Sequence, residues 1–197
     1  MPPKTVFNEE EVIHAAFDLA IEGGINILSA RKIAEKLNSS TAPVYSTFES
    51  MDLLKEAVLS KAKDLMFEYA TRSYTSSIFL NMGTGYALFA RDYKELYRSI
   101  FLDNEGSIEM LHDFMSNLTD EMIKDDMMKH LPKEEQNSVM ERMSIFTHGY
   151  AAFICAGFME EVSKQDIIKA MYDMGRDVIG HALYRNGKEE YINNKEQ

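Results

Sequence analysis

The sequence contains a single cysteine and few of the residues that break helices. Each scarcity excludes a class of protein. Its 197 residues include 10 glycines and 4 prolines, whereas these two residues together make up roughly 12% of an average chain. So few turn-forming residues argue against a β-sandwich or barrel and against a Gly-rich nucleotide-binding fold. One cysteine excludes an internal disulfide framework and a cysteine-based zinc cluster.

Long hydrophobic runs are also missing. The longest nearly apolar run, Tyr150–Met159, has ten residues, whereas a membrane-spanning helix needs about 20. The first residues are Met-Pro-Pro-Lys, and Glu9–Glu11 follow shortly after. This start lacks the apolar core of a signal peptide. We therefore expect a cytoplasmic protein with no membrane partner.

Hydrophobic residues recur at helical spacing along nearly the whole chain. Capping residues mark three helix starts: Asn8 with Glu11 as its reciprocal partner, Ser29, and Ser50. A long helix should follow Ser50. Later helices are expected over 78–90, 96–102, 108–122, 138–158 and 164–185. The sequence thus predicts an all-α fold of about nine helices.

Residues 29–48 read SARKIAEKLNSSTAPVYSTF, which predicts a short helix, a tight turn and a second short helix. This order is typical of a helix-turn-helix, whose second helix enters the DNA major groove. Four apolar residues should form the seam between the two helices: Ile33, Ala34, Leu37 and Val44. Asn38 lies where the chain reverses, and asparagine tolerates the left-handed backbone conformation.

The start of the second helix combines a cap with a proline. Ser40 is predicted to be the N-cap, and Pro43 falls in the first turn, where its missing N–H breaks no intrahelical hydrogen bond. The Ser40 hydroxyl should therefore accept from the N–H of Ala42. The exposed face should present small hydroxyl and methyl groups and one phenol to bases and phosphates: Thr41, Ala42, Pro43, Tyr45 and Ser46.

The residues after this motif extend it into a longer pattern. The parts of the pattern are Ile33-Ala34, Leu37-Asn38-Ser39-Ser40, Val44-Tyr45, Phe48, Ser50 and Leu53-Leu54. On these residues, the stretch from about 8 to 58 resembles the TetR-family (tetracycline-repressor-like) transcriptional regulators. Two positions depart from the family pattern: Asn38 replaces the usual turn glycine and Met51 the usual lysine. Lys55, one turn further on, is the candidate replacement for that lysine.

The resemblance implies a helix-turn-helix DNA-binding domain over 1–50 and an effector-binding and dimerisation domain over 51–197. It implies a homodimer that binds a palindromic operator in double-stranded DNA, represses nearby genes and is released by a small-molecule effector. The residues expected to contact DNA are Arg31, Ser40, Thr41, Ala42, Pro43, Tyr45, Ser46 and Lys55.

The acidity of the whole chain weighs against DNA binding. Acidic residues outnumber basic ones by 32 to 21, which gives a formal net charge of −11. Within 29–48, however, Arg31, Lys32 and Lys36 face a single acid, Glu35. Because phosphate contacts dominate DNA affinity, a local basic strip is sufficient if the other acids face away. An alternative stays open, in which the same scaffold is a ligand carrier or protein-interaction module that does not bind DNA.

The second half of the chain carries aromatic and methionine side chains that suit a small apolar or amphipathic effector. The ligand-binding candidates lie where three long helices should converge: Tyr86, Phe89, Tyr93, Met110, Phe114, Met143, Phe146 and Tyr150. Most of the 14 methionines are expected to be plain core.

The last two long helices predict the dimer interface. An apolar stripe on the first of them is expected to include Phe153, and small residues lie opposite: Gly149, Ala152, Ala156 and Gly157. The segment 167–183 is apolar on more than one face, which requires partners on both sides. We expect the helices near 138–158 and 164–185 to pair with their symmetry mates in a four-helix bundle.

Nothing in the sequence predicts catalysis, a cofactor or a metal. It has no Gly-rich phosphate loop, nucleophile elbow or HExxH motif, so no enzyme is expected. His112 and His148 lack metal-ligand spacing and should cap helices or fill the core. Cys155 lies in an apolar stretch and should be an inert buried thiol. The acidic pair Asp125-Asp126 should be solvated at a helix end.

Overall fold

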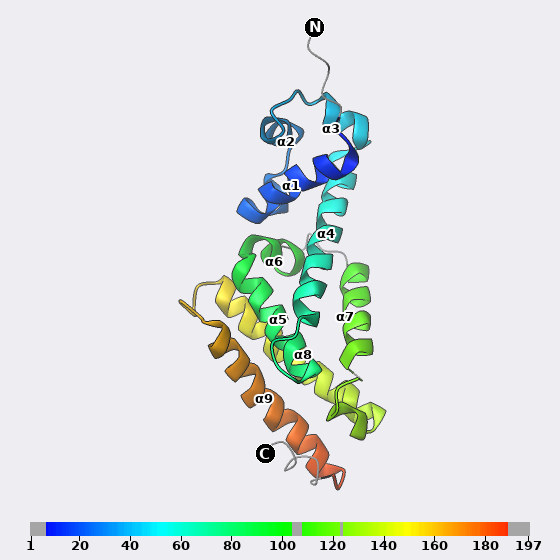
Figure 1. Ribbon diagram of the computed structural model, residues 1–197, viewed down its shortest axis with the longest axis vertical. Helices are drawn as coiled ribbons and strands as arrows, with labels where there is room; N and C mark the ends of the chain where they lie inside the picture. The colour runs from blue at the N-terminus through cyan, green and yellow to red at the C-terminus, as the bar shows by residue number, and fades with distance from the viewer. Residues whose placement is uncertain (1–6, 104–107, 123, 189–197) are drawn as a thin grey trace. The chain divides into compact units, whose positions relative to one another are not determined.

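The computed structural model describes residues 7–103, 108–122 and 124–188, without the side chains of 108–111, 113 and 114. Regular secondary structure in these residues is entirely helical, which confirms the predicted all-α fold (Figure 1). Nine α-helices and two short 3₁₀ helices follow one another in this part of the chain: α1 (Glu9–Gly23), η1 (Ile25–Ile27), α2 (Ala30–Lys36), α3 (Ala42–Thr47), α4 (Met51–Thr71), α5 (Ile78–Asp92), α6 (Lys94–Phe101), α7 (Ile108–Met122), η2 (Met128–His130), α8 (Lys133–Cys155) and α9 (Lys164–Arg185).

Contacts divide the chain into two compact units. The first takes in Met1–Leu65 and Tyr93–Ile108, and the second takes in Met66–Asp92 and Glu109–Gln197. The first unit therefore contains α1 to α3, most of α4, and α6. These units group contacts, and the functional division predicted between residues 50 and 51 stays a prediction.

The first helix begins as the sequence predicts. The Asn8 side chain accepts from the Glu11 N–H, and the Glu11 carboxylate accepts from the Asn8 N–H, both at 2.9 Å. Val12, Ala16 and Ala20 of α1 are fully buried, because they share one side of the helix at helical spacing. The reciprocal cap thus fixes which side of α1 meets the core of the first unit.

The end of α1 brings the chain close to α6. Gly24 has φ of +78°, and a Cβ at this position would lie 2.9 Å from the Ser99 hydroxyl oxygen of α6. The same oxygen accepts from the Ile25 N–H at 3.0 Å. Glycine is therefore required both for the left-handed turn and for the close approach that joins α6 to the core of the first unit.

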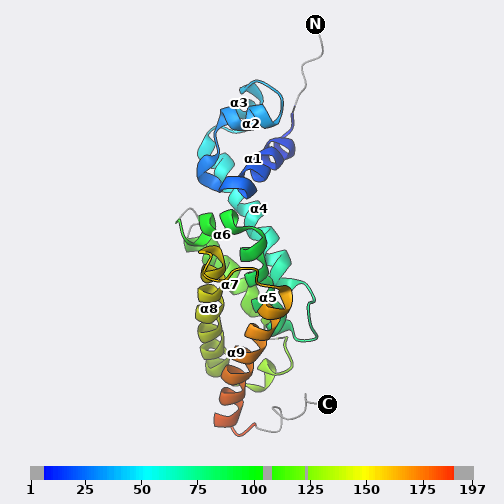
Figure 2. The ribbon, with the colours of Figure 1, turned by 90° about the vertical axis from the view of Figure 1, so that its left-hand side faces the viewer.

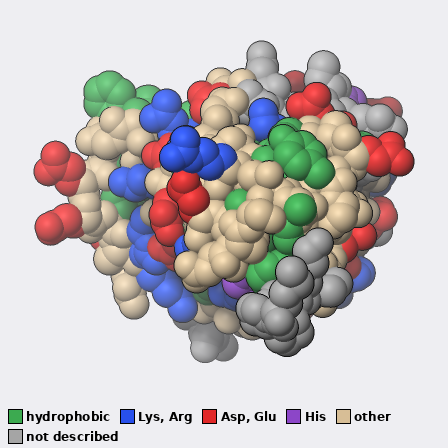
Figure 3. All heavy atoms as spheres, turned by 90° about the horizontal axis from the view of Figure 1, so that it is seen from above, with side chains coloured by type: hydrophobic (Ala, Val, Ile, Leu, Met, Phe, Trp, Pro, Cys, Tyr) green, Lys and Arg blue, Asp and Glu red, His purple; other side chains and the backbone are tan. Residues whose placement is uncertain are grey.

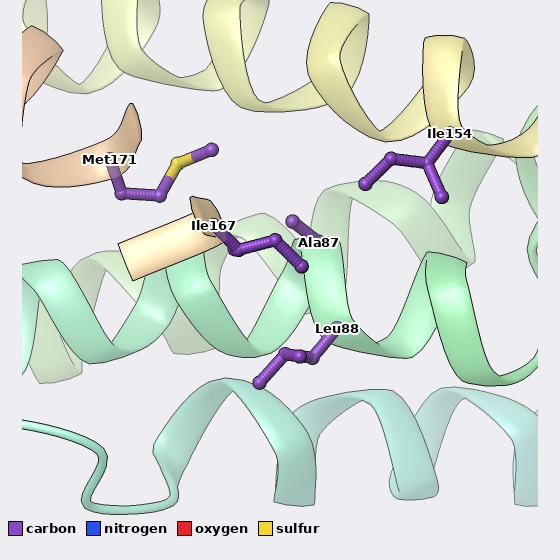
Figure 4. Close-up of a cluster of buried hydrophobic side chains, with 5 residues drawn as sticks. All are labelled: Ala87, Leu88, Ile154, Ile167 and Met171. Atoms are coloured by element: carbon purple, nitrogen blue, oxygen red, sulfur yellow. The ribbon is translucent and has the colours of Figure 1, made fainter. Parts of the chain in front are cut away.

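Helices α5, α8 and α9 lie side by side in the second unit (Figures 1 and 2). A buried cluster joins one side of each helix: Ala87 and Leu88 from α5, Ile154 from α8, and Ile167 and Met171 from α9 (Figure 4). Because α9 packs against both α5 and α8, a wide arc of its surface is buried within its own chain.

The packing of α5 against the end of α4 depends on one glycine. A Cβ at Gly85 would overlap the backbone carbonyl group of Tyr69 and the Cα of Ala70. Any larger residue would push the two helices apart, because these neighbours are backbone atoms that cannot rotate away.

Asp125 corrects the prediction that the Asp125-Asp126 pair is solvated. Its side chain is only 3% exposed. The carboxylate accepts from the Ser77 hydroxyl at 2.8 Å, the Phe79 N–H at 3.0 Å and the Met127 N–H at 3.0 Å. The first N–H groups of α5 have no partner within the helix, so a carboxylate from elsewhere in the chain satisfies them and complements the helix dipole.

We predict that Asp125→Ala lowers the free energy of unfolding by about 2–4 kcal/mol, since it leaves several buried donors without an acceptor. Urea denaturation followed by circular dichroism measures this loss. Asp126→Ala is the matched control, because Asp126 is exposed and forms a surface ion pair with Lys129 at 2.7 Å. Surface pairs contribute roughly 0–1 kcal/mol. Equal losses in the two variants would contradict the role assigned to Asp125.

Candidate functional site

The predicted helix-turn-helix is present in α2, α3 and the turn between them. The Ser29 hydroxyl accepts from the Lys32 N–H at 3.3 Å and caps α2, as predicted. Asn38, in the turn, has φ of +50°, which confirms the left-handed conformation expected of it. The Ser50 hydroxyl accepts from the Leu53 N–H at 3.2 Å at the start of α4, as predicted.

The start of α3 differs from the prediction by one residue. The Ser40 hydroxyl accepts from the Ala42 N–H at 3.4 Å, as expected, and Pro43 lies in the first turn of the helix. The N-cap residue, however, is Thr41, whose φ and ψ of −72° and −8° are already helical. Pro43 has no N–H, so the N–H that is left for capping is that of Ala42. The hydroxyl that accepts from it belongs to Ser40, the residue before the N-cap.

The seam between α2 and α3 is buried. Ile33, Ala34 and Val44 are at most 4% exposed, while Leu37 is half-buried. Phe48, just after α3, is also buried. These contacts fix α3 against α2 from one side, so the opposite side of α3 is held in a defined orientation toward solvent.

That outer side carries the residues that the sequence singles out. Thr41, Ala42, Tyr45 and Ser46 are exposed, and Tyr45 reaches 61%. Pro43 is half-buried, and its carbonyl accepts from the Ser46 hydroxyl at 2.9 Å. The outer side of α3 therefore offers a phenol, an exposed threonine hydroxyl and methyl groups.

The basic side chains near α3 lie close to carboxylates of their own unit. Arg31 Nε lies 2.9 Å from Glu35 Oε1, and Lys36 Nζ lies 3.6 Å from both Asp18 Oδ2 and Glu22 Oε1. On the face seen in Figure 3, blue basic and red acidic side chains likewise lie next to one another. The local excess of basic residues read from 29–48 is therefore largely balanced by neighbouring acids, some of them far away in sequence.

Two further positions concern the start of α4. Lys55 and Met51 are both half-buried. The Lys55 side chain is thus less exposed than expected for the lysine that the sequence predicts as a phosphate contact.

Seven of the eight ligand-binding candidates belong to the second unit, and five of these have described side chains: Tyr86, Phe89, Met143, Phe146 and Tyr150. Tyr86, Phe89 and Met143 are buried, whereas Phe146 and Tyr150 are half-buried and pack against the core cluster shown in Figure 4. Tyr93 falls in the first unit. The side chains of Met110 and Phe114 lie outside the described residues.

The structure pairs two polar side chains that sequence reasoning did not bring together. The Tyr86 hydroxyl lies 3.1 Å from His148 Nδ1, joining α5 to α8. Burial lowers the pKa of the half-buried His148 imidazole below its ordinary value of 6.5, because desolvation disfavours the charged form. The two residues are 62 positions apart, so no local pattern could have revealed the contact.

This lowered pKa predicts a pH dependence of stability. Unfolded protein binds a proton at this imidazole as the pH falls below 6.5, whereas the folded protein binds it only at lower pH. The free energy of unfolding should therefore fall as the pH drops from 6.5 through the folded-state pKa, and then level off. Thermal melts of His148→Gln should lose this part of the slope, while the exposed His181→Gln should keep it. Identical slopes in both variants would contradict the assignment.

The outer surface of α8 is more apolar than that of α9. Ile145 is 69% exposed and Phe153 57% exposed, and a Cβ at Gly149 would meet no described atom within 4 Å. Phe158, just after α8, is 80% exposed and packs edge-on against Phe153. The apolar stripe predicted to include Phe153 therefore turns outward at this residue, because steps of three and four residues drift around the helix.

Part of the wide apolar arc of α9 is buried within the chain. Four of its apolar residues are buried in the single chain: Ile167, Met171, Ile179 and Leu183. The outer side of α9 instead carries charge, including the Lys169–Asp173 ion pair. Burial within the chain thus accounts for part of the apolar width of α9, while Ile168 and Met174 are half-buried and Tyr172 and Tyr184 are exposed. The part that α9 takes in a dimer stays a prediction.

Three observations concern metal binding, the cysteine and membrane insertion. In the described residues, no group of three or more His, Cys, Asp or Glu side chains could hold a metal ion. Cys155 is half-buried, and its Sγ lies 3.5 Å from the Ala90 carbonyl oxygen. No helix in this part of the chain has the length and hydropathy that crossing a bilayer requires.

Comparison with known proteins identifies the architecture. No family model and no curated protein matches the sequence. Among solved structures, a TetR-family transcriptional regulator from Streptomyces coelicolor superposes with a TM-score of 0.70 at 14% identity, over 93% of this chain and 85% of that one. The chain has the TetR-family fold.

Two more TetR-fold structures agree with this result. A TetR-family regulator from Rhodococcus sp. gives a TM-score of 0.60 at 15% identity, over 86% of this chain and 97% of that one. A TetR variant from Acinetobacter baumannii, solved in complex with minocycline, gives 0.56 at 14% identity, over 92% and 95%. The TetR fold predicted from residues 8–58 therefore extends over most of the chain.

Proposed function

We propose that this protein is a DNA-binding transcriptional regulator and that α3 reads the DNA sequence. The observation that carries the proposal is the outer side of α3, where Thr41, Tyr45 and Ser46 are exposed on a helix held by a buried seam. A helix of this kind enters the major groove of DNA. Hydroxyl groups can exchange hydrogen bonds with base edges or phosphates, and the methyl group of Ala42 suits the methyl group of thymine.

The paired cations near α3 support a particular mode of binding. Arg31 and Lys36 already contact carboxylates, so each must give up or share an ion pair to reach a phosphate. The binding free energy that these side chains gain by neutralising phosphates is therefore smaller than the gain of cations without an ion pair. We infer that polar and apolar contacts of α3 contribute a large share of the affinity and that the salt dependence is shallow.

We further propose that two copies bind DNA together through α8 and α9, with the outer side of α8 in the contact. On this side Ile145 and Phe153 are exposed in the single chain, and a Cβ at Gly149 would meet no described atom within 4 Å. A two-fold dimer uses the same surface on both copies, and a glycine allows close approach of two helices. The dimer would place its two α3 helices one DNA turn apart, or a multiple of it, on a palindromic operator.

The second unit is proposed to bind a small effector that releases the protein from DNA and so relieves repression. The aromatic and methionine residues between α5 and α8 suit an apolar or amphipathic molecule, and the structurally similar A. baumannii protein is solved in complex with minocycline. The difference between the affinities of the effector for the two conformations limits how far it shifts the protein toward the one that does not bind DNA.

Selection from a pool of random DNA duplexes tests the proposal, because it requires no assumption about the operator sequence. The purified protein should enrich an inverted repeat whose half-sites lie about 34–36 Å apart, or a multiple of one helical turn. The alternative of a ligand carrier or protein-interaction module, which the balanced charge of the first unit favours, predicts no enrichment of any sequence at low salt.

A further inference from the structure

Arg142 of α8 carries a buried cationic nitrogen that has no hydrogen-bond partner among the residues that the structure describes. Its Nε donates to the Ser138 carbonyl of the same helix at 3.1 Å. Its terminal Nη2 is buried, and no residue in the described part of the chain accepts a hydrogen bond from it. Burying an unpaired charge is costly, so a buried guanidinium nitrogen of this kind indicates a position where an acceptor binds.

The Glu135 carboxylate, on the same side of α8 as Arg142, already has a partner. Glu135 lies seven residues earlier, two helical turns away on the same side of α8. Its Oε2 accepts from Arg185 Nη2 of α9 at 2.9 Å. With no acceptor for Nη2 among the described residues, we expect the acceptor to come from a molecule that binds the protein.

Next to Arg142 on the same side of α8 are two aromatic residues. Phe146 and Tyr150 follow Arg142 at four and eight residues, the spacing that lines up side chains on one helix face. Their ring centroids are 6.0 Å apart, and both are half-buried against the core cluster of Figure 4. One stripe of α8 thus combines apolar rings with a guanidinium at its end.

We propose that this stripe binds an amphipathic carboxylate, whose apolar body lies along Phe146 and Tyr150 and whose head group pairs with Arg142. Since Nε donates to the Ser138 carbonyl and Nη2 has no acceptor among the described residues, Nη2 is the donor that a carboxylate oxygen of the ligand would accept from. A single cation in a chain with a formal net charge of −11 favours a singly charged head group over a dianionic phosphate.

This assignment rests on the proposed effector site in the second unit and specifies the ligand class that it takes. It can be tested separately, because binding of a carboxylate is measurable without DNA. Absence of carboxylate binding would overturn the assignment and leave DNA recognition standing, whereas absence of DNA binding would leave the carboxylate site unaffected.

Calorimetric titration at pH 7 with two matched pairs of probes tests it: decanoate against 1-decanol, and 2-naphthoate against 2-naphthol. Wild-type protein should bind at least one carboxylate more tightly than its neutral partner. Arg142→Gln should weaken the binding of that carboxylate by about tenfold or more, as expected when a charge-assisted hydrogen bond is lost. The affinity for the neutral partner should stay unchanged. Arg176→Gln, which removes an exposed arginine of α9, is the matched control and should bind as the wild type does.

The melting temperature of Arg142→Gln is a second readout, which shows whether the variant is still folded. Because Nη2 has no partner in the ligand-free protein, Arg142→Gln should melt at the wild-type temperature or above it. A clear loss of stability would show that Arg142 is a structural residue and would overturn the proposal. Equal binding of carboxylate and neutral probes, unchanged carboxylate binding by Arg142→Gln, or no binding of any probe would also overturn it.

Discussion

Replacing Thr41 and Tyr45 together by alanine should abolish sequence-specific DNA binding while leaving the fold intact. Both side chains are exposed on the outer side of α3, so their removal creates no cavity in the core. Each specific contact with a base discriminates by about 1–3 kcal/mol. The double variant should therefore lose roughly two orders of magnitude in affinity for the selected duplex.

Fluorescence anisotropy with the selected duplex measures this loss, and a thermal melt checks the fold. Asn26→Ala with Ser60→Ala is the matched control, because both residues are exposed in the first unit and neither lies on α2 or α3. If the Thr41/Tyr45 variant bound as tightly as this control, α3 would not be the helix that reads DNA.

Replacing Ile145 and Phe153 together by glutamate should convert a dimer into a monomer. The two residues are 69% and 57% exposed in the single chain, so the charges are harmless there. In a two-fold interface each substitution occurs twice, and four unpaired carboxylates would have to be buried together. The dissociation constant of the dimer should rise by several orders of magnitude, since even one unpaired buried charge costs several kcal/mol.

Analytical ultracentrifugation at micromolar concentration measures the change. Leu102→Glu, at a leucine of the first unit that is 44% exposed, controls for the general effect of a new surface charge. The monomeric variant should also lose affinity for a palindromic duplex, because two linked half-sites bind far more tightly than one. A wild-type protein that is monomeric at all concentrations, or a glutamate variant that stays dimeric, would contradict the proposed interface.

The sequence predicts the local features of the first unit well. The reciprocal cap of Asn8 and Glu11, the left-handed Asn38 and the Ser40 hydrogen bond to Ala42 all depend on residues within three positions of each other. Such features follow from hydrogen-bonding capacity and backbone sterics alone. The buried seam of α2 and α3 follows as well, because its residues recur at helical spacing.

The features that the sequence does not predict connect residues far apart in the chain. Asp125 reads as a surface acid, yet it caps α5 through Ser77 and Phe79, more than 40 positions earlier. The pairing of Tyr86 with His148 likewise depends on how α5 packs against α8. These contacts are fixed by helix register, which a single sequence does not encode in any local pattern.

The apolar faces of the long helices show the limit of reading a periodic pattern. The wide arc of α9 suggests a second subunit, but much of it is buried against α5 and α8 within the chain, while Ile168 and Met174 are half-buried. Phe153 continues the inward stripe by spacing but lies outward, because steps of three and four residues drift around a helix with 3.6 residues per turn. A pattern therefore shows which residues share a helix face without showing what that face contacts.

Hydroxyl-radical footprinting of the selected duplex tests the central claim most directly. A dimer that inserts one α3 helix into each of two major grooves should protect two patches related by the centre of the inverted repeat, about 34–36 Å apart or a multiple of one helical turn. The Thr41→Ala, Tyr45→Ala variant should protect neither patch at the same protein concentration. No protection by the wild-type protein, or equal protection by this variant, would contradict DNA reading by α3.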